Sequence, residues 1–322
     1  MKKKIVIWGY PIHTHTHSYI HDAFYKAFLH LGYETYWFHD GSYPEDFDFS
    51  DCIFWTEGFA DKNIPLNKSS IYFVHVCPSP KKYIDAGVKK FIDVRYNHVW
   101  HKDHVYEYTM DKSKVEKIGP SCYFQKANPG IVDVKNEYSD YTIGDYDKLY
   151  ITWAANYLPN EFNFDDIRHP RKNIINFCGV LTSGGRCENM SQFKPFIDES
   201  IKNGISFFQN DPFVNPLPND EVIRRAKESI LGVDIRGPEH IRNGYVPCRI
   251  FKSISWGHLG MTNSEEVYTE LDGHCLFEKD TAKLFYSAMD KKEDVKFIRE
   301  CMEYVRDNHT YINRIQSIMS LI

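Results

Sequence analysis

The sequence lacks several features that would assign the chain to a class at once. It holds no run of 18 apolar residues, so we expect no membrane-spanning helix. The N-terminal MKKKIVIWGY has too short an apolar part for a signal peptide and is typical of a first strand. The net charge is only −5, from 39 basic and 44 acidic residues, which disfavours a strongly basic nucleic-acid binder.

The composition that is present fits a folded enzyme. The 322 residues can form two domains of about 150 residues, each with its own core. Aromatic residues make up 16% of the chain, which disfavours disorder. The eight cysteines include no C-x-x-C pair, so we expect reduced cytoplasmic thiols and neither a disulfide framework nor a zinc–cysteine site.

Short apolar runs alternate with segments of helical periodicity through the whole chain. The pattern predicts βαβ units and parallel sheets, hence an α/β fold. In the first half, strands are predicted at residues 4–8, 35–39, 51–56, 70–76, 90–94 and 121–124, and a helix at 19–31. In the second half, strands are predicted at 173–178, 205–208, 230–235, 259–262 and 276–277, and helices at 192–204, 218–229, 249–256 and 294–322.

Residues 151–172 mix proline, asparagine and aromatics without periodicity, and we interpret them as the crossing between two domains, 1–151 and 152–300. Of the 12 arginines, 11 lie at or after Arg168, whereas 17 lysines precede residue 150 and 10 follow it. Arginine is suited to bidentate recognition of phosphate. We therefore expect an anionic ligand on the second domain.

The first motif is CGVLTSGGR, Cys178–Arg186, at the end of a predicted strand. Glycines let backbone N–H groups approach an anion, and a helix N-terminus favours negative charge. The motif is neither a Walker loop nor G-x-G-x-x-G. It suits a phosphate-binding turn, and an ordinary strand–turn–helix connection is the alternative.

The second motif is GPEHIRNGYVPCRIFKSISWGHLGMTN, Gly237–Asn263. Arg242 lies in a polar loop, and Arg249 lies in the first turn of a helix that begins near Pro247. A loop arginine and an arginine at a helix N-terminus together suit a diphosphate. A surface ion pair at Arg249 is the alternative.

These two motifs resemble the donor half of GT-B glycosyltransferases, among them phage DNA β-glucosyltransferases and bacterial enzymes. The segment WAANYLPNEF, Trp153–Phe162, resembles the interdomain crossing of the bacterial members. The resemblance implies two facing Rossmann-like domains with parallel sheets, an N-terminal one for the acceptor and a C-terminal one for a nucleotide-sugar. It also implies that residues 301–322 form a helix packing back on the N-terminal domain.

The resemblance further implies a donor site in which Arg186 and Arg249 contact the diphosphate, joined by Arg242. Lys252 departs from the family, where many members have a glutamate that accepts hydrogen bonds from ribose, because lysine cannot accept any. Ribose recognition would then pass to Glu239 or Asn263. The predicted donor-site residues are Gly179, Ser183, Gly184, Arg186, Arg242, Asn243, Gly244, Arg249, Lys252 and Asn263.

Three alternating histidines, His13, His15 and His17, follow the first predicted strand. Open α/β sheets bind ligands at the carboxyl ends of their strands, and in GT-B enzymes this loop faces the acceptor. No carboxylate or cysteine lies in register with the histidines, so we predict cleft-lining or proton-transfer roles and no metal site. Metal binding and a plain surface loop are the alternatives. Glu161 is a weaker candidate for a sugar contact.

The ends of two further strands supply candidate catalytic bases, His75, Asp61 and Glu57. An inverting transferase needs a general base near the acceptor hydroxyl, and His75 is the preferred candidate. The alternatives are a solvated loop for the two carboxylates and a hydrogen-bonded core position for His75.

The predicted function is therefore a cytoplasmic glycosyltransferase that uses a UDP-sugar, with a GDP-sugar as the alternative. Its acceptor would be a glycan, a lipid or a small molecule, and the balanced charge disfavours DNA. Two D-x-D matches, Asp46–Asp48 and Asp145–Asp147, lie in polar, turn-like stretches, so neither a metal nor a cofactor is expected. The alternatives are an inactive GT-B-like binding module and a Rossmann-type NAD(P)-dependent enzyme, although WGYPIHTH holds only one glycine.

Overall fold

The structure is a computed structural model, and two compact units make up the chain. The first unit is built from the chain up to Ile151 together with Tyr311–Ile322, and the second from Thr152–Thr310. The described residues are 3–77, 80–95, 115–127, 135–136, 139–142, 146–181, 189–212, 214–242 and 244–322.

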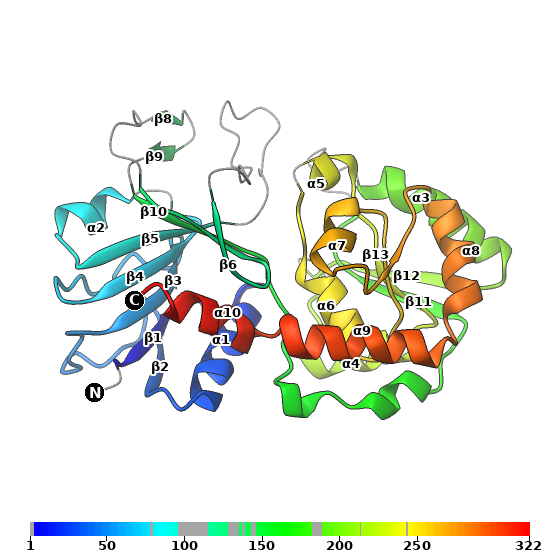
Figure 1. The fold of residues 1–322 in the computed structure, drawn as a ribbon, viewed down its shortest axis with the longest axis horizontal. Helices are drawn as coiled ribbons and strands as arrows, with labels where there is room; N and C mark the ends of the chain where they lie inside the picture. The colour runs from blue at the N-terminus through cyan, green and yellow to red at the C-terminus, as the bar shows by residue number, and fades with distance from the viewer. Residues whose placement is uncertain are drawn as a thin grey trace. The chain divides into compact units, whose positions relative to one another are not determined.

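A large, mostly parallel sheet forms the first unit, which confirms the α/β prediction (Figure 1). Its strand order is β2 (Thr35–Phe38), β1 (Ile5–Trp8), β3 (Ile53–Glu57), β4 (Ile71–His75), β5 (Lys90–Arg95), β10 (Asp147–Ile151), β7 (Cys122–Gln125) and β6 (Glu116–Gly119). The strands from β2 to β10 run parallel, and β7 and β6 each run antiparallel to the strand before them in this order. A short separate pair joins β8 (Lys135–Asn136) to β9 (Ser139–Thr142).

Apolar side chains cover both faces of this sheet, as a parallel sheet requires. On one face, helices α1 (Ser18–His30) and α10 (Tyr311–Met319) lie side by side. Phe24 of α1 packs against Trp55 at a ring-centroid distance of 4.1 Å and against Tyr311 at 4.7 Å. On the other face, α2 (Lys81–Asp85) places Tyr83 against Tyr72.

The helix predicted over residues 294–322 is two helices, α9 (Val295–Asn308) in the second unit and α10 in the first. The helix breaks because the backbone of His309 leaves the helical region, and its carbonyl accepts a hydrogen bond from the N–H of Ala155 at 2.9 Å. Within the first unit, the fully buried Arg314 of α10 donates from Nη1 to the carbonyl oxygen of Pro120 at 2.8 Å.

Five short strands lie in the second unit, as a parallel pair and a parallel group of three. They are β11 (Ile174–Cys178), β12 (Ser206–Asn210), β13 (Gly232–Asp234), β14 (Gly260–Thr262) and β15 (Leu276–Phe277). β11 pairs with β12, and β14 pairs with both β13 and β15. The N–H of Ile230, just before β13, donates to the carbonyl of Ile174 at 2.8 Å, so the spatial order is β12, β11, β13, β14, β15.

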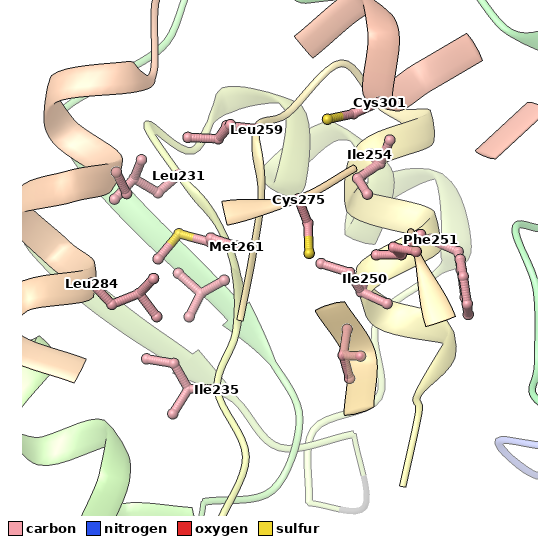
Figure 2. Close-up of a cluster of buried hydrophobic side chains, with 14 of the residues drawn as sticks. Leu231, Ile235, Ile250, Phe251, Ile254, Leu259, Met261, Cys275, Leu284 and Cys301 are labelled. Atoms are coloured by element: carbon pink, nitrogen blue, oxygen red, sulfur yellow. The ribbon is translucent and has the colours of Figure 1, made fainter. Parts of the chain in front are cut away.

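Helices pack around these strands and enclose an apolar core. They are α3 (Asn189–Lys202), α4 (Asn219–Glu228), α5 (Pro238–Arg242), α6 (Cys248–Ser255), α7 (Glu265–Glu270), α8 (Thr281–Lys291) and α9, with short 3-10 helices η1 (Pro159–Glu161) and η2 (Phe164–Arg168). Figure 2 shows part of the core, where Ile250 and Ile254 project from α6 toward Cys275. The amphipathic α6 is therefore anchored by its buried face, which fixes the position of its first turn.

The prediction that Asp145–Asp147 lies in a polar turn was wrong for Asp147, and Asp145 lies outside the described residues. Asp147 begins the buried strand β10, where its carboxylate lies 3.1 Å from Nζ of Lys126 and accepts from the N–H of Ala127. The ion pair and the backbone hydrogen bond let a carboxylate begin a buried strand. None of the described helices has the length and apolar character needed to cross a membrane.

Candidate functional site

The first cluster of polar residues lies where the strand order of the first unit reverses. From β1 the chain passes to β2 on one side of β1, and it then returns to β3 on the other side. Ligands of open α/β sheets bind at such switch points, at the carboxyl ends of the strands. His17 precedes α1 in the connection after β1, whereas Glu57 and His75 end β3 and β4 and face each other in register.

Three imidazole rings surround one carboxylate oxygen in this cluster. Oε2 of Glu57 lies 2.7 Å from Nδ1 of His17, 3.8 Å from Nε2 of His21 and 3.9 Å from Nδ1 of His75. The side chains of His21, His75 and Glu57 are 3–4% exposed, and that of His17 is 19% exposed. His17 is therefore the member of the cluster that a ligand reaches most easily.

Burial sets the charge state of the cluster. It lowers the pKa of His21 to about 3 and that of His75 to about 4, so both rings are neutral near pH 7. Burial alone would raise the pKa of Glu57, but the interactions with His17 and His75 outweigh it and hold that pKa well below its usual range. The cluster thus combines a carboxylate with neutral imidazoles, which have lone pairs for a proton or a cation.

A glycine makes the position of His21 possible. Gly9 follows β1, and a Cβ atom at this position would lie 2.2 Å from two atoms of the His21 ring. Tyr10, the next residue, stacks on His21 with a centroid distance of 6.1 Å and on His15 at 4.2 Å. The turn after β1 is therefore shaped to hold the ring of His21 against the sheet edge.

The three alternating histidines have three different environments. His13 is exposed, and His15 stacks on Tyr10. Only His17 reaches Glu57. The alternating spacing therefore does not itself form a chelate, and the carboxylate that the sequence did not place in register comes from β3.

Asp61, a candidate base, has a different set of partners. Its carboxylate accepts a hydrogen bond from the hydroxyl of Tyr83 and lies 2.8 Å from Nζ of Lys82. Lys82 also donates to the carbonyl oxygen of Asp61 at 2.7 Å. The side chain of Asp61 is buried, so these contacts tie α2 to the loop after β3. Of the three candidate bases, the structure brings Glu57 and His75 together, whereas Asp61 contacts Tyr83 and Lys82 of α2.

The second cluster lies at the corresponding switch point of the second unit, between β11 and β13. The guanidinium of Arg249, at the start of α6, lies 4.3 Å from the ring centroid of Phe177. Its Nη2 donates to the carbonyl oxygen of Cys178 at 3.0 Å. Gly179 leaves room for this contact, because a Cβ there would lie 2.3 Å from Nη2. The side chain of Arg249 is 27% exposed, so the charge remains accessible.

Arg236, which the sequence analysis missed, adds a second guanidinium to this cluster. Its Nε lies 3.0 Å from Oδ1 of Asp234, and Nη1 of Arg249 lies 4.0 Å from the same oxygen. The side chain of Asn263 accepts from the N–H of Arg236 at 2.7 Å and donates to its carbonyl at 3.0 Å. The signal was the D-x-R spacing at the end of a strand, which turns both side chains to the same side.

Two guanidinium groups share one carboxylate here, which leaves positive charge in excess. Burial and the charge of Arg236 lower the pKa of Arg249. Burial and both arginines lower the pKa of His240 to about 3. An anion would relieve this positive potential, which makes the cluster a candidate anion site.

Asn189, the first described residue after the glycine-rich motif, links the loops at the same switch point. Its Oδ1 accepts from the N–H of Gly237 at 2.8 Å, and its Nδ2 donates to the carbonyl of Val180 at 3.1 Å. The loops after β11 and β13 are therefore held together beside Arg249. A lone asparagine after a glycine-rich turn carries no sequence signal for this role.

The other predicted donor-site residues, together with Glu161 as a candidate sugar contact, divide into three groups. Lys252 lies on α6 one turn after Arg249, and Gly244 lies in the turn after α5, which Arg242 ends. Glu161 is exposed, and its Oε2 accepts from the N–H of Leu158 at the start of η1, so it caps that helix. The predicted residues outside the described part of the chain are Ser183, Gly184, Arg186 and Asn243.

Comparisons of the chain with protein-family models, with curated proteins and with solved structures found no match. A functional proposal is therefore argued from the two clusters of polar residues. One cluster combines a buried carboxylate with imidazoles, and the other holds arginines in excess.

Proposed function

We propose that the chain is a GT-B glycosyltransferase that moves a sugar from a nucleotide-diphosphate sugar to a hydroxyl acceptor. In this proposal the two units face each other, the second binding the donor and the first the acceptor. The observation that carries the proposal is Arg249, a partly exposed guanidinium at the carboxyl end of a parallel sheet, beside a second arginine and, among the residues that the structure describes, one carboxylate. The shared strand order, with a switch point in each unit, supports the same proposal.

Arg249 would bind the diphosphate of the donor. When the bond from the anomeric carbon to the diphosphate oxygen breaks, its electron pair and negative charge go to the leaving diphosphate. The guanidinium and the first N–H groups of α6, which has no side-chain cap, would stabilise that charge. The contacts of Arg249 with Phe177 and Cys178 hold the guanidinium in place before a ligand binds, which reduces the reorganisation needed.

The acceptor hydroxyl would lose its proton at the Glu57 cluster. Its oxygen forms the new bond to the anomeric carbon, and the proton passes to a base. The neutral imidazoles of the cluster can take up that proton, and Glu57, whose pKa is held well below its usual range, would stabilise the imidazolium that forms. Glu57→Gln should therefore lower kcat strongly and leave the affinity for the nucleotide nearly unchanged, since the nucleotide binds to the other unit.

The finer assignments are part of the same proposal. UDP is the favoured nucleotide and GDP the alternative, on the strength of the sequence resemblance. A glycan, a lipid or a small molecule is favoured over DNA because the net charge is nearly balanced. A cytoplasmic location follows from the cysteine pattern of the sequence.

A panel of ligands tests the proposal through the melting temperature. UDP, GDP, their glucose conjugates, uridine and NAD⁺ are added separately, and a ligand at 100 times its Kd contributes about 2.7 kcal/mol of apparent stability. We expect a nucleoside diphosphate or its sugar conjugate to raise Tm more than uridine does. Release of the diphosphate from the conjugate, by transfer or by slow hydrolysis, should then fall in Glu57→Gln. A panel in which no nucleotide raises Tm would overturn the proposal, and a shift with NAD⁺ alone would favour a dehydrogenase.

A further inference from the structure

The Glu57 cluster has the ligand set of a transition-metal site. Nδ1 or Nε2 of His17 and His75 and a carboxylate oxygen of Glu57 all lie within 4.8 Å of one another. His21 adds a third imidazole, with Nε2 3.8 Å from Oε2 of Glu57. His17 and His21 are four residues apart at the start of α1, so both rings lie on the same side of the helix.

The distances between these atoms are close to those between the ligand atoms of a zinc site. Zinc forms bonds of about 2.0–2.2 Å to imidazole nitrogen and carboxylate oxygen, so tetrahedral ligand atoms lie about 3.3 Å apart. The observed separations from Oε2 of Glu57 are 2.7 Å to His17, 3.8 Å to His21 and 3.9 Å to His75. These three separations differ from the tetrahedral value by about 0.6 Å or less.

The backbone holds three of the four side chains where a metal would need them. Glu57 and His75 are paired in register on neighbouring buried strands, and Gly9 admits the ring of His21. Sites on strands and helices are more rigid than sites on loops, which lowers the cost of assembling the ligands. The partial exposure of His17 leaves an approach from solvent.

The chemistry of the donors selects the class of metal. Imidazole nitrogens with one carboxylate suit Zn²⁺ and its neighbours Co²⁺ and Ni²⁺, whereas Mg²⁺ and Ca²⁺ prefer oxygen ligands throughout. Two or three histidines with one glutamate, and one coordination position left open, are the pattern of catalytic zinc sites. We propose that His17, Glu57 and His75, with His21 beside them, bind one Zn²⁺ ion in the first unit.

This inference departs from the sequence-based expectation that no metal is needed, because that expectation considered the loop histidines and the two D-x-D matches, and no carboxylate brought to the histidines by another strand. If the proposed function also holds, the ligand side chains are no longer the base when the cation is bound; the cation would lower the pKa of the acceptor hydroxyl, and the proton would pass to solvent water. The metal site itself depends only on the four side chains and not on the transferase activity.

The test is zinc binding by the tag-free full chain, measured by calorimetry with ZnCl₂ alone and by metal analysis after dialysis. We expect one Zn²⁺ per chain with micromolar or tighter affinity, and no heat with Mg²⁺. His17→Ala and Glu57→Gln should each weaken binding by more than about 100-fold, since loss even of a residue that only orients a ligand costs 10–100-fold. Both are mild changes, because His17 is partly exposed and Gln keeps the shape of Glu57. Substitution by Co²⁺ should give the strong visible absorption of a four- or five-coordinate ion.

The matched control is His13→Asn, which removes an exposed histidine of the same loop and keeps a residue that tolerates the left-handed backbone at this position. Its zinc affinity should equal that of the wild type. Absence of stoichiometric binding, or equal weakening by His13→Asn and His17→Ala, would overturn the site and indicate chelation by the loop. Nucleotide binding to the chelator-treated protein is measured separately, so a failure of the metal site is distinguishable from a failure of the transferase proposal.

Discussion

Replacing Arg249 by methionine separates the charge of this residue from its packing. Methionine has a stem of similar length that can remain over the ring of Phe177, but it cannot donate a hydrogen bond to Cys178 or to a phosphate. Because Asp234 already pairs with Arg236, Arg249 supplies the charge that is left for an anion. A hydrogen bond to a charged group contributes about 1.5–3 kcal/mol. The Kd for UDP should therefore rise about 10- to 150-fold.

The assay is calorimetry with uridine, UMP and UDP at one ionic strength. The loss should be largest for UDP, smaller for UMP and within about twofold for uridine, which carries no phosphate. Added salt should weaken UDP binding less in the variant than in the wild type, since the variant has lost one charge. The free energy of unfolding should fall by only about 1 kcal/mol, the contribution of the lost hydrogen bond to Cys178.

The control is Arg224→Met. Arg224 is an exposed arginine of the same unit, and it pairs with Glu221 and Glu228 along α4. Its removal should leave the Kd for UDP unchanged. Equal losses for uridine and UDP in Arg249→Met, or a loss in Arg224→Met of the same size, would refute the assignment of Arg249 as the diphosphate ligand.

Two further predictions concern buried polar groups. Burial lowers the pKa of His258 to about 3. Below pH 6.5 the unfolded chain therefore takes up a proton that the folded chain does not. As the pH falls in this range, the free energy of unfolding should decrease by about 1.4 kcal/mol per pH unit. His258→Gln keeps a donor for the carbonyl of Ala226 and should make that pH dependence shallower in denaturant titrations between pH 7 and 5; an unchanged slope would contradict the assignment. Asp61→Asn should lower Tm, through lost contacts with Tyr83 and Lys82, and leave kcat close to wild type; a kcat loss like that of Glu57→Gln at unchanged Tm would make Asp61 the base.

Most strands of both units could be predicted because their signal is local, whereas β6, β8, β9 and β10 were not predicted. Apolar runs such as IVIW and IYFVH, bounded by polar turns, mark buried parallel strands whatever lies next to them. Once a strand is predicted, the residues at its carboxyl end are known as well. This is why His17, Glu57 and His75 could be expected to meet at one edge of a sheet. The positions of Gly179 directly after β11 and of Arg249 in the first turn of α6 could be predicted for the same reason.

The side-chain contacts that distinguish one candidate site residue from another could not be predicted, because they join parts of the chain that are far apart in sequence. His17 and Glu57 are 40 residues apart, and only the register of β1, β3 and β4 brings them to 2.7 Å. The pairing of Asp61 with Tyr83 depends on how α2 packs, which no periodicity reports. The break at His309 likewise depends on a hydrogen bond from Ala155, far back in the chain.

The return of α10 to the first unit has a consequence for the order in which the protein folds during synthesis. Among the described residues the second unit is a single stretch, Thr152–Thr310, and it leaves the ribosome before α10 does. Until then the apolar face of α1 around Phe24 lacks Tyr311, and the carbonyl of Pro120 lacks Arg314, 194 residues further on. Contacts of such long sequence separation form slowly. The first unit to be synthesised is thus the last to be completed, and during that interval its exposed α1 is the surface for a chaperone to cover.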